Sequence, residues 1–216
     1  MREFIWVDEP EQLEKVVELA RGYSVIAFDG EMDSYYCYTT KLCLVQMAVG
    51  ETDILIDSLA LKDLSPLNEL TQDPKILKVF HAGENDVPYF RQHGVEFRNI
   101  FDTHLAARLL DLPSKSYGGL VEIYFKVELQ KDQQRTDWRV RPLADEQLTY
   151  ARQDTQYLAE LAELLQPELV EAEADEEAGH IFRSLESRVL REKAFDPDAW
   201  AKIREPRSFP VSSALS

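Results

Sequence analysis

Four runs of β-forming residues lie within the first 80 positions, and they constrain the fold more than any other feature of the chain. The runs cover residues 24–28, 42–49, 53–56 and 76–80. The connection Gly50-Glu51-Thr52 is short enough to form a hairpin between the second and third runs. We therefore expect these runs to be four strands of one mixed sheet.

Helical patterns occupy most of the remaining chain. Near the N-terminus, Asp8 and Glu11 have the spacing of a capping box, and the apolar face that follows ends before Gly22, so we expect the first element to be a helix. Further helices are expected at residues 65–70, 85–92, 103–110, 117–125 and 145–165, with a short fifth strand at 99–102. This order predicts an α/β domain in which helices flank a mixed β-sheet.

The charge balance limits the classes of function. The chain has 24 Lys and Arg against 40 Asp and Glu, a formal net charge of −16. Such a charge repels a polyanion and argues against a protein that coats nucleic acid non-specifically, although it does not exclude a nuclease. Part of the excess lies in an acidic stretch at residues 168–177, which is typical of a solvated helix face.

Two cysteines are too few for a disulfide framework. Cys37 and Cys43 stand near apolar residues, so we expect them to be small apolar fillers in a reducing cytoplasm. No segment approaches the roughly 20 apolar residues of a membrane span, so no membrane partner is expected.

Three acidic motifs suit metal chemistry. Asp29 and Glu31 end an apolar strand at spacing i and i+2, so their side chains project from one face and need a cation between them. Asp86 follows the run at 76–80 and leads into a helix. Tyr150 and Asp154 are four residues apart and share a helix face. Each motif alone has a structural explanation: an acidic turn, a helix cap or a buried tyrosine.

Together, and in this order, the acidic motifs and Tyr150 resemble those of the DEDDy 3′-5′ exonucleases, most closely ribonuclease D. Matching stretches also include Val45-Gln46 and the runs at 101–110 and 137–143. The resemblance spans roughly residues 28–165 and rests on several ordered motifs. It implies a ribonuclease H-like mixed β-sheet flanked by α-helices.

The resemblance also implies a mechanism. Asp29, Glu31, Asp86 and Asp154 are expected to hold two divalent cations, Mg²⁺ or Mn²⁺, because hard cations prefer carboxylate oxygens. Two such ions stabilise both the attacking water and the leaving 3′ oxygen of an in-line displacement. Tyr150 is expected to orient the water as a fifth catalytic residue. The implied reaction removes nucleoside 5′-monophosphates from the 3′ end of RNA.

Six residues in or beside these motifs are expected to contact the substrate: Gly30, Gln46, His81, Trp138, Arg139 and Arg141. Trp138 and Tyr117 could stack on bases or could be packing residues, and the two arginines could contact phosphates or only solvent. Gly30 stands where the family more often has a residue such as Thr. We therefore expect a missing contact to the terminal nucleotide and more loosely held metal ligands.

The resemblance further suggests a division of the chain and its partners. We expect a 3′-5′ exonuclease catalytic domain at residues 1–166, a helical extension at 167–193, and a linker or tail at 194–216 without the accessory helical nucleic-acid-binding domain. The expected partner is RNA with a single-stranded 3′ end, such as a tRNA precursor or another structured RNA. Two alternatives stay open: a 3′-5′ DNA exonuclease, and a weakly active or non-catalytic RNA-binding module.

Overall fold

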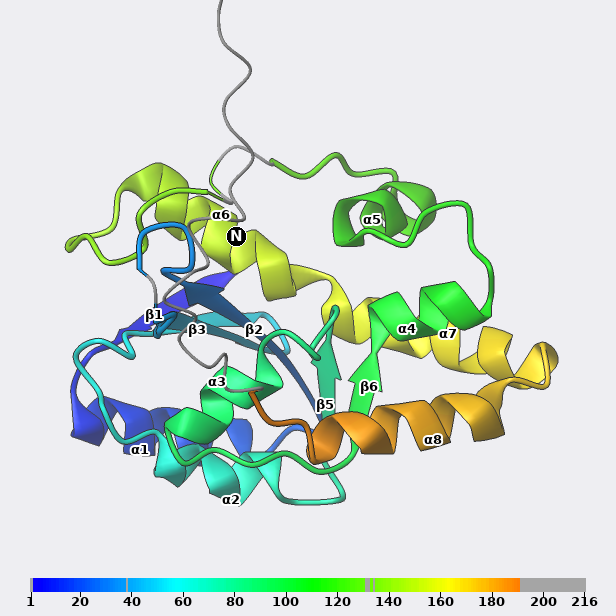
Figure 1. The fold of residues 1–216 in the computed structure, drawn as a ribbon, viewed down its shortest axis with the longest axis horizontal. Coiled ribbons are helices and arrows are strands. Elements are labelled where there is room, and N and C mark those ends of the chain that lie inside the picture. Colours follow the sequence, from blue (N-terminus) through cyan, green and yellow to red (C-terminus); the bar gives the residue numbers. More distant parts are fainter. Residues whose placement is uncertain (1, 38, 131–132, 134, 191–216) are drawn as a thin grey trace, which may run out of the picture.

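A six-stranded mixed sheet forms the centre of the molecule (Figure 1). The computed structural model describes residues 2–37, 39–130, 133 and 135–190. The strands are β1 (Glu3–Val7), β2 (Val25–Met32), β3 (Leu42–Val49), β4 (Thr52–Ile56), β5 (Leu77–Phe80) and β6 (Ile100–Asp102), in the order β1-β4-β3-β2-β5-β6. β3 is antiparallel to β2 and β4, and the remaining pairs are parallel. The predicted mixed sheet and its hairpin are confirmed.

Two expectations about the strands are corrected. A helix does not come first, because β1 precedes it at the edge of the sheet. After Glu3 the sequence of β1 is continuously apolar, so it lacks the apolar-polar alternation of a half-buried strand. β2 is longer than the predicted 24–28 and continues to Met32, because β3 provides paired residues as far as Leu42.

Helices cover both faces of the sheet. They are α1 (Pro10–Ala20), the 3₁₀ turn η1 (Ser65–Leu67), α2 (Asn68–Thr71), α3 (Val87–Gln92), α4 (Thr103–Leu109), α5 (Tyr117–Phe125), α6 (Asp145–Gln156), α7 (Leu158–Glu171) and α8 (Asp175–Glu186). The predicted helix at 117–125 is confirmed at both ends. The cap of α1 lies one residue later than expected, since Glu9 is the N-cap and its N–H donates to Gln12 Oε1 at 3.0 Å.

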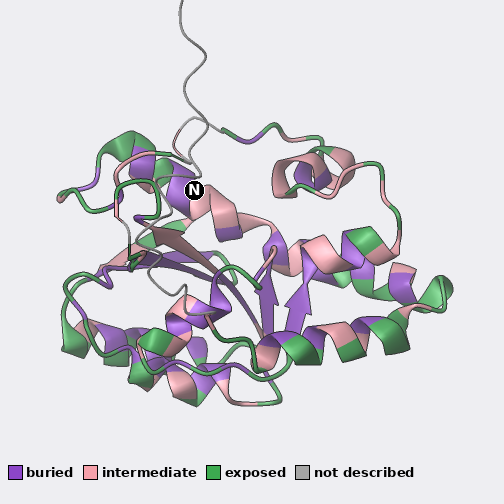
Figure 2. Cartoon of the chain, viewed as in Figure 1, coloured by how far each residue is buried: buried purple, intermediate pink, exposed green. Residues whose placement is uncertain are grey.

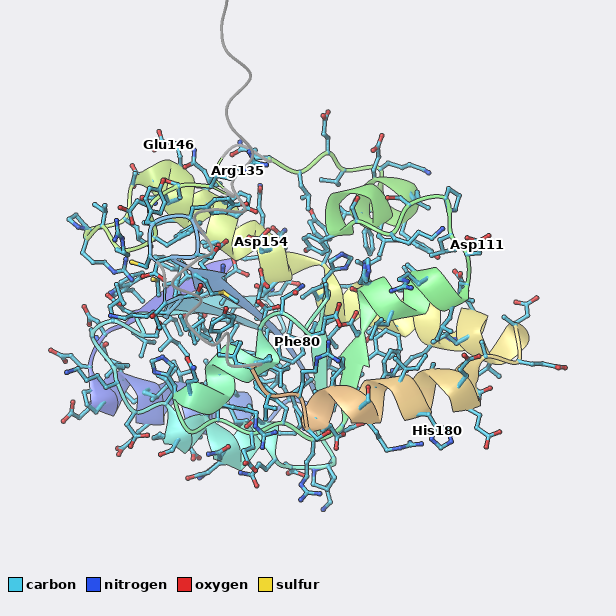
Figure 3. The ribbon with its side chains drawn as sticks, in the orientation of Figure 1. Phe80, Asp111, Arg135, Glu146, Asp154 and His180 are labelled. Atoms are coloured by element: carbon cyan, nitrogen blue, oxygen red, sulfur yellow. The ribbon has the colours of Figure 1, made fainter. Side chains whose placement is uncertain are left out.

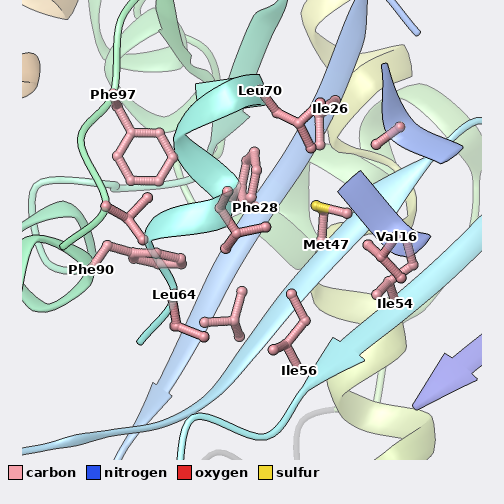
Figure 4. Close-up of a cluster of buried hydrophobic side chains, with 14 of the residues drawn as sticks. Val16, Ile26, Phe28, Met47, Ile54, Ile56, Leu64, Leu70, Phe90 and Phe97 are labelled. Carbon is pink, nitrogen blue, oxygen red and sulfur yellow. The ribbon is translucent and has the colours of Figure 1, made fainter. Parts of the chain in front are cut away.

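Alternate residues of β2 face two different cores. Ile26 and Phe28 pack with residues of α1, α2 and α3 (Figure 4). The Phe28 and Phe80 rings stack with centroids 5.8 Å apart. Ala27 points to the opposite side, where α4, α5, α7 and α8 pack. Burial on both faces, visible in Figure 2, specifies the register, because a slip of one residue would exchange the two faces.

The C-terminal helices differ from the prediction. The expected single helix at 145–165 is two helices, α6 and α7, which meet at Tyr157, where φ is −109° and ψ is 4°. The predicted boundary after residue 166 falls inside α7. α8 packs back on the sheet, with the Phe182 and Phe101 ring centroids 4.9 Å apart. The predicted tail at 194–216 lies outside the described residues.

The remaining observations concern the cysteines and the membrane. Both cysteines are free thiols. Cys43 lies beneath α6, and its burial raises the pKa of the thiol to about 12, as expected of an apolar filler. Within the described ranges, none of the helices has the length and apolar character to cross a bilayer.

Candidate active site

The pleat of β2 places Asp29 and Glu31 on one side of the sheet. They follow Ala27 toward the face covered by α6 and α7, whereas Phe28 and Gly30 face α3. β2 pairs with β5 only over Val25–Ala27, whereas its pairing with β3 continues past Asp29 and Glu31. The two carboxylates therefore lie just beyond the end of β5, on backbone that β3 holds from one side.

Asp86 reaches the same site from the loop between β5 and α3. It is the N-cap residue of α3, yet its carboxylate accepts no capping hydrogen bond from the described residues, so its oxygens remain available. One of these oxygens would lie 3.8 Å from a Cβ at position 30. The Asp86 carboxylate therefore lies close to the β2 backbone at Gly30.

Asp102 holds the loop that carries Asp86. Its buried carboxylate accepts hydrogen bonds from the N–H groups of Ala82 (3.2 Å) and Gly83 (2.7 Å), and also caps α4. Ala82 has a φ of 59°, a left-handed conformation that costs a non-glycine residue about 1 kcal/mol. The hydrogen bonds to Asp102 hold the backbone in this conformation, which directs Asp86 toward β2.

α6 contributes Tyr150 and Asp154, one turn apart on the face that points toward β2. Both side chains interact with Asp29 and Glu31, and the Tyr150 hydroxyl also interacts with the Asp154 carboxylate. The Trp138 and Tyr150 ring centroids are 6.1 Å apart, so the indole packs against the phenol. Figure 3 shows Asp154 above the sheet near the middle of the molecule.

The four carboxylates repel one another in a desolvated space. Burial raises the pKa of Asp29 to about 7. Burial, followed by the negative charges of its acidic neighbours, raises the pKa of Glu31 well above its usual range. The pKa values of Asp86 and Asp154 are also raised, first by burial and then by the charge of Asp29. A bound cation would remove much of this repulsion.

These residues fit a hard divalent cation. Asp154 Oδ2 is buried and has no hydrogen-bond partner among the described residues, and a buried anionic oxygen needs a counter-charge. The side chains converge without forming a closed cage, since in the described part of the chain no three His, Cys, Asp or Glu groups have the spacing of a finished metal site. Because the carboxylates repel one another, they can move into contact distance of one another only when a cation lies between them.

A cleft of about 440 Å³ opens onto Asp29, Tyr150 and Asp154. The start of α5 and residues 129–130 form its opposite wall, and His81 also lines it. The cleft therefore gives a small polar molecule access to three of the five candidate catalytic residues.

His81 is a neutral hydrogen-bond acceptor in this cleft. Its Nδ1 lies 2.9 Å from Thr103 Oγ1, and the Thr103 hydroxyl donates to the Phe80 carbonyl at 3.1 Å. Because that hydroxyl has a single proton, Nδ1–H must be the donor to Thr103 and Nε2 carries the free lone pair. Burial, with the nearby His104, lowers the pKa of His81 to about 3, so the ring is uncharged near neutral pH.

A second hollow of about 400 Å³ touches Glu31. Tyr35 lines this hollow and is 64% exposed, and the adjacent Tyr36 is 48% exposed. The Arg135 guanidinium lies 5.8 Å from the Tyr35 ring centroid, and the Arg139 guanidinium lies 5.1 Å from that of Tyr36. We call these four side chains the Tyr-Arg surface. It is a cationic and aromatic surface beside an acidic site.

Comparison with known proteins identifies the family. A family model described as 3′-5′ exonuclease matches residues 4–170, a range that contains all four carboxylates and Tyr150. The chain belongs to the 3′-5′ exonuclease family. Exonucleases of the DEDD type within this family generally use divalent metal ions.

Relatives of this exonuclease chain include longer proteins, of which only a part matches it. Exosome complex component 10 of Rattus norvegicus is 40% identical over 169 residues, which are 76% of this chain and 19% of that protein. Exosome complex exonuclease RRP6 of Saccharomyces cerevisiae is 34% identical over 194 residues, 89% of this chain and 26% of that protein. The chain thus spans about a fifth to a quarter of the length of these two relatives.

Solved exonuclease structures confirm the predicted ribonuclease H-like fold. The catalytic core of RRP6 from Trypanosoma brucei has a TM-score of 0.87 and 30% identity, and covers 94% of this chain and 56% of that chain. Escherichia coli RNase D, described as an exoribonuclease involved in structured RNA processing, has a TM-score of 0.79 and 32% identity, with 91% and 52% covered.

Three of the six residues that were expected to contact substrate have side chains that are buried or paired with other groups of the protein. Trp138 is 1% exposed and Gln46 is fully buried opposite Asp29, so neither side chain reaches a nucleotide. Arg141 donates two hydrogen bonds to the buried Asp57 and others to backbone carbonyls. Trp138 and Gln46 therefore lie in the protein interior, whereas the partly exposed Arg141 ties its own segment to Asp57 and to the Cys43 carbonyl.

The other three lie at or beside the site. His81 lines the cleft, and Arg139 is at the surface, although Asp137 already accepts two of its hydrogen bonds at 2.8 Å. Gly30 is paired with Val45 in the β2–β3 ladder, whose register shifts between Glu31 and Met32, and a Cβ at Gly30 would lie 2.9 Å from Leu42 Cδ1. Close packing therefore surrounds this glycine, and the expected loosening of the metal ligands stays a prediction.

Sequence reasoning missed Tyr35, Tyr36 and Asp102 as residues of the site. The tyrosine pair begins four residues after Glu31, and this proximity to an acidic motif was an available signal. Asp102 lies within the matching run at 101–110, but its hydrogen bonds to the loop before Asp86 exist only in the tertiary structure.

Proposed function

We propose that this chain is a metal-dependent 3′-5′ exoribonuclease that releases nucleoside 5′-monophosphates. The observation that carries the proposal is the convergence of four carboxylates and one tyrosine hydroxyl on a single desolvated site. They come from β2, the loop before α3, and α6, three segments that are far apart in sequence. Clustered acids destabilise a metal-free protein, so their convergence indicates a function that needs a cation.

Asp29, Glu31, Asp86 and Asp154 would hold two cations, either Mg²⁺ or Mn²⁺. Such ions, when bound, stabilise the charge that develops on the attacking and leaving oxygens of a phosphodiester. Asp29 interacts electrostatically with each of the other three carboxylates, so it is the residue best placed to bridge the two ions.

Tyr150 would orient the attacking water. Burial, followed by the charges of Asp154 and Glu31, raises the pKa of Tyr150 well above its usual range, so its hydroxyl stays protonated. A protonated phenol can position water by hydrogen bonding but cannot remove its proton. The free lone pair of His81 Nε2 would accept a hydrogen bond from a ribose hydroxyl of the terminal nucleotide.

The proposed substrate is RNA with a single-stranded 3′ end, including tRNA precursors or other structured RNA with such an end. The Tyr-Arg surface would carry the nucleotides next to the scissile bond, because bases stack on aromatic rings and phosphates pair with arginines. RNA is also the substrate named for E. coli RNase D. We further propose a reducing compartment such as the cytoplasm, since both cysteines are free thiols.

The test is a degradation assay with RNA labelled at either end, in Mg²⁺, in Mn²⁺ and in a chelator. We expect 3′-labelled RNA to release labelled mononucleotide at once, while 5′-labelled RNA shortens stepwise, and neither to change in the chelator. Internal cuts would contradict the proposal. A DNA strand of the same sequence tests the DNA alternative, and binding without cleavage in either metal would favour the non-catalytic alternative.

A further inference from the structure

A side chain from α5 interrupts the helix that carries Asp154. The Tyr117 hydroxyl donates a hydrogen bond to the Gln153 carbonyl at 2.8 Å and accepts one from the Tyr157 N–H at 3.1 Å. In a continuous α-helix these two backbone groups would bond to each other, because residues i and i−4 are partners. The hydroxyl therefore stands between the two ends of one helical hydrogen bond.

This insertion accounts for the division into α6 and α7. Side chains that enter the i to i−4 ladder are a recognised cause of helix kinks. Tyr157 is the C-cap of α6 and the N-cap of α7, and its backbone leaves the helical region at the point where the hydroxyl enters. Asp154 is the residue next to Gln153, so the break lies within one turn of a candidate metal ligand.

Tyr117 is itself firmly placed. It is the first residue of α5, whose N-cap Ser116 accepts a hydrogen bond from Gly119 N–H, and the preceding Lys115 carbonyl accepts one from His104 Nδ1 at 2.8 Å. The Tyr117 ring also lies 5.7 Å from the His81 ring, centroid to centroid, and lines the cleft that holds Asp154. The hydroxyl thus links α5 to the end of α6 across the site.

We infer that Tyr117 is a positioning residue that directs the Asp154 carboxylate toward the metal site by holding open the hydrogen bond between Gln153 and Tyr157. The inference rests on the proposed function, because it takes Asp154 as a metal ligand. Without the hydroxyl, Tyr157 N–H and the Gln153 carbonyl can bond directly, and the straightened helix would turn Asp154 away from its present direction.

The test compares Tyr117→Phe with Tyr124→Phe. Both changes remove one hydroxyl from α5, but the Tyr124 hydroxyl donates to Glu168 on α7, away from the break. For each variant, Mn²⁺ binding is measured by calorimetry, single-turnover cleavage is measured across Mn²⁺ concentrations, and the backbone amide signals of residues 153–157 are compared by NMR.

We expect Tyr117→Phe to weaken Mn²⁺ binding by roughly 10- to 100-fold, the usual range for residues that orient a metal ligand. Its amide signals should move at 153–157, and saturating Mn²⁺ should recover most of the cleavage rate. Tyr124→Phe should match wild type. Wild-type Mn²⁺ affinity in Tyr117→Phe, or an equal loss of affinity in Tyr124→Phe, would overturn this inference and leave the proposed function standing. Absence of Mn²⁺ binding by the wild-type chain would overturn the proposed function and, with it, this inference.

Discussion

Arg141 and Asp57 form an ion pair in which a partly exposed guanidinium donates to both oxygens of a buried carboxylate, at 2.6 and 2.8 Å. Removal of the arginine would leave an unpaired carboxylate in the protein interior. We therefore expect Arg141→Met to destabilise the fold by about 3–5 kcal/mol, measured by urea denaturation. Arg139→Met is the matched control, and its more exposed pair with Asp137 should contribute below about 1 kcal/mol. Equal effects of the two changes would refute the structural role of Arg141.

Asp29→Asn and Asp154→Asn should abolish cleavage in Mg²⁺ while the metal-free protein becomes more stable near pH 8. Each change removes a metal ligand and also one of the charges that repel in the buried cluster. Thermal denaturation in chelator and a cleavage assay in Mg²⁺ measure the two effects. Wild-type cleavage by either purified variant would exclude that residue from the metal site.

Metal binding should depend on pH through Asp29. Its pKa of about 7 in the folded, metal-free state lies above the ordinary value of about 4, so protons compete with the cation below pH 7. We expect Mn²⁺ affinity to fall by about tenfold or more per pH unit between pH 7 and pH 5, because the other three carboxylates also have raised pKa values and add to the competition by protons. Calorimetry at several pH values checks this, and a flat profile from pH 5 to pH 8 would contradict it.

The same carboxylate sets the sign of the stability change. A raised pKa in the folded state means that folding favours the protonated acid, so metal-free stability should decrease as pH rises from about 4 through 7. Saturating Mn²⁺ should cancel this decrease, because it binds only the folded, deprotonated form. Denaturation with and without Mn²⁺ at pH 5 and pH 8 measures the difference.

Tyr150→Phe keeps the ring that packs against Trp138 and removes only the hydroxyl. We expect nearly unchanged affinity for RNA and metal, with a single-turnover rate lower by about 10²- to 10⁴-fold, as for other positioned hydrogen-bonding groups in catalysis. A wild-type rate in this variant would remove Tyr150 from the mechanism.

The Tyr-Arg surface predicts a dependence on substrate length. Replacing both Tyr35 and Tyr36 by Ala should weaken binding of a ten-nucleotide RNA by roughly 30-fold or more, because two stacked bases at about 1–3 kcal/mol each contribute at least about 2 kcal/mol. Cleavage of a dinucleotide, which occupies only the metal site, should stay near the wild-type rate. Tyr23→Ala is the control, since this tyrosine is also exposed but lines a different hollow. Equal losses with both substrates would place Tyr35 and Tyr36 in the catalytic site itself.

Local sequence patterns were sufficient to predict the two strands of the hairpin, the helix at 117–125 and the shared helix face of Tyr150 and Asp154. These features depend on the spacing of apolar and acidic residues over a few positions, and such spacing determines which side chains share a face. The ordered acidic motifs were also sufficient to predict the family, since each motif includes residues required by the same chemistry.

Only the tertiary structure decided what distant residues do to one another. From the motifs alone, Arg141 could contact a phosphate or only solvent, but in the structure Asp57, 84 positions away, pairs with it. The helix at 145–165 looked continuous because nothing within it predicts the entry of the Tyr117 hydroxyl from 40 positions away at Tyr157. Periodicity reports which face of an element is apolar, but it contains no information about which polar group lies opposite. That depends on how the chain folds back, and a hydrogen bond forms only where donor and acceptor finally meet.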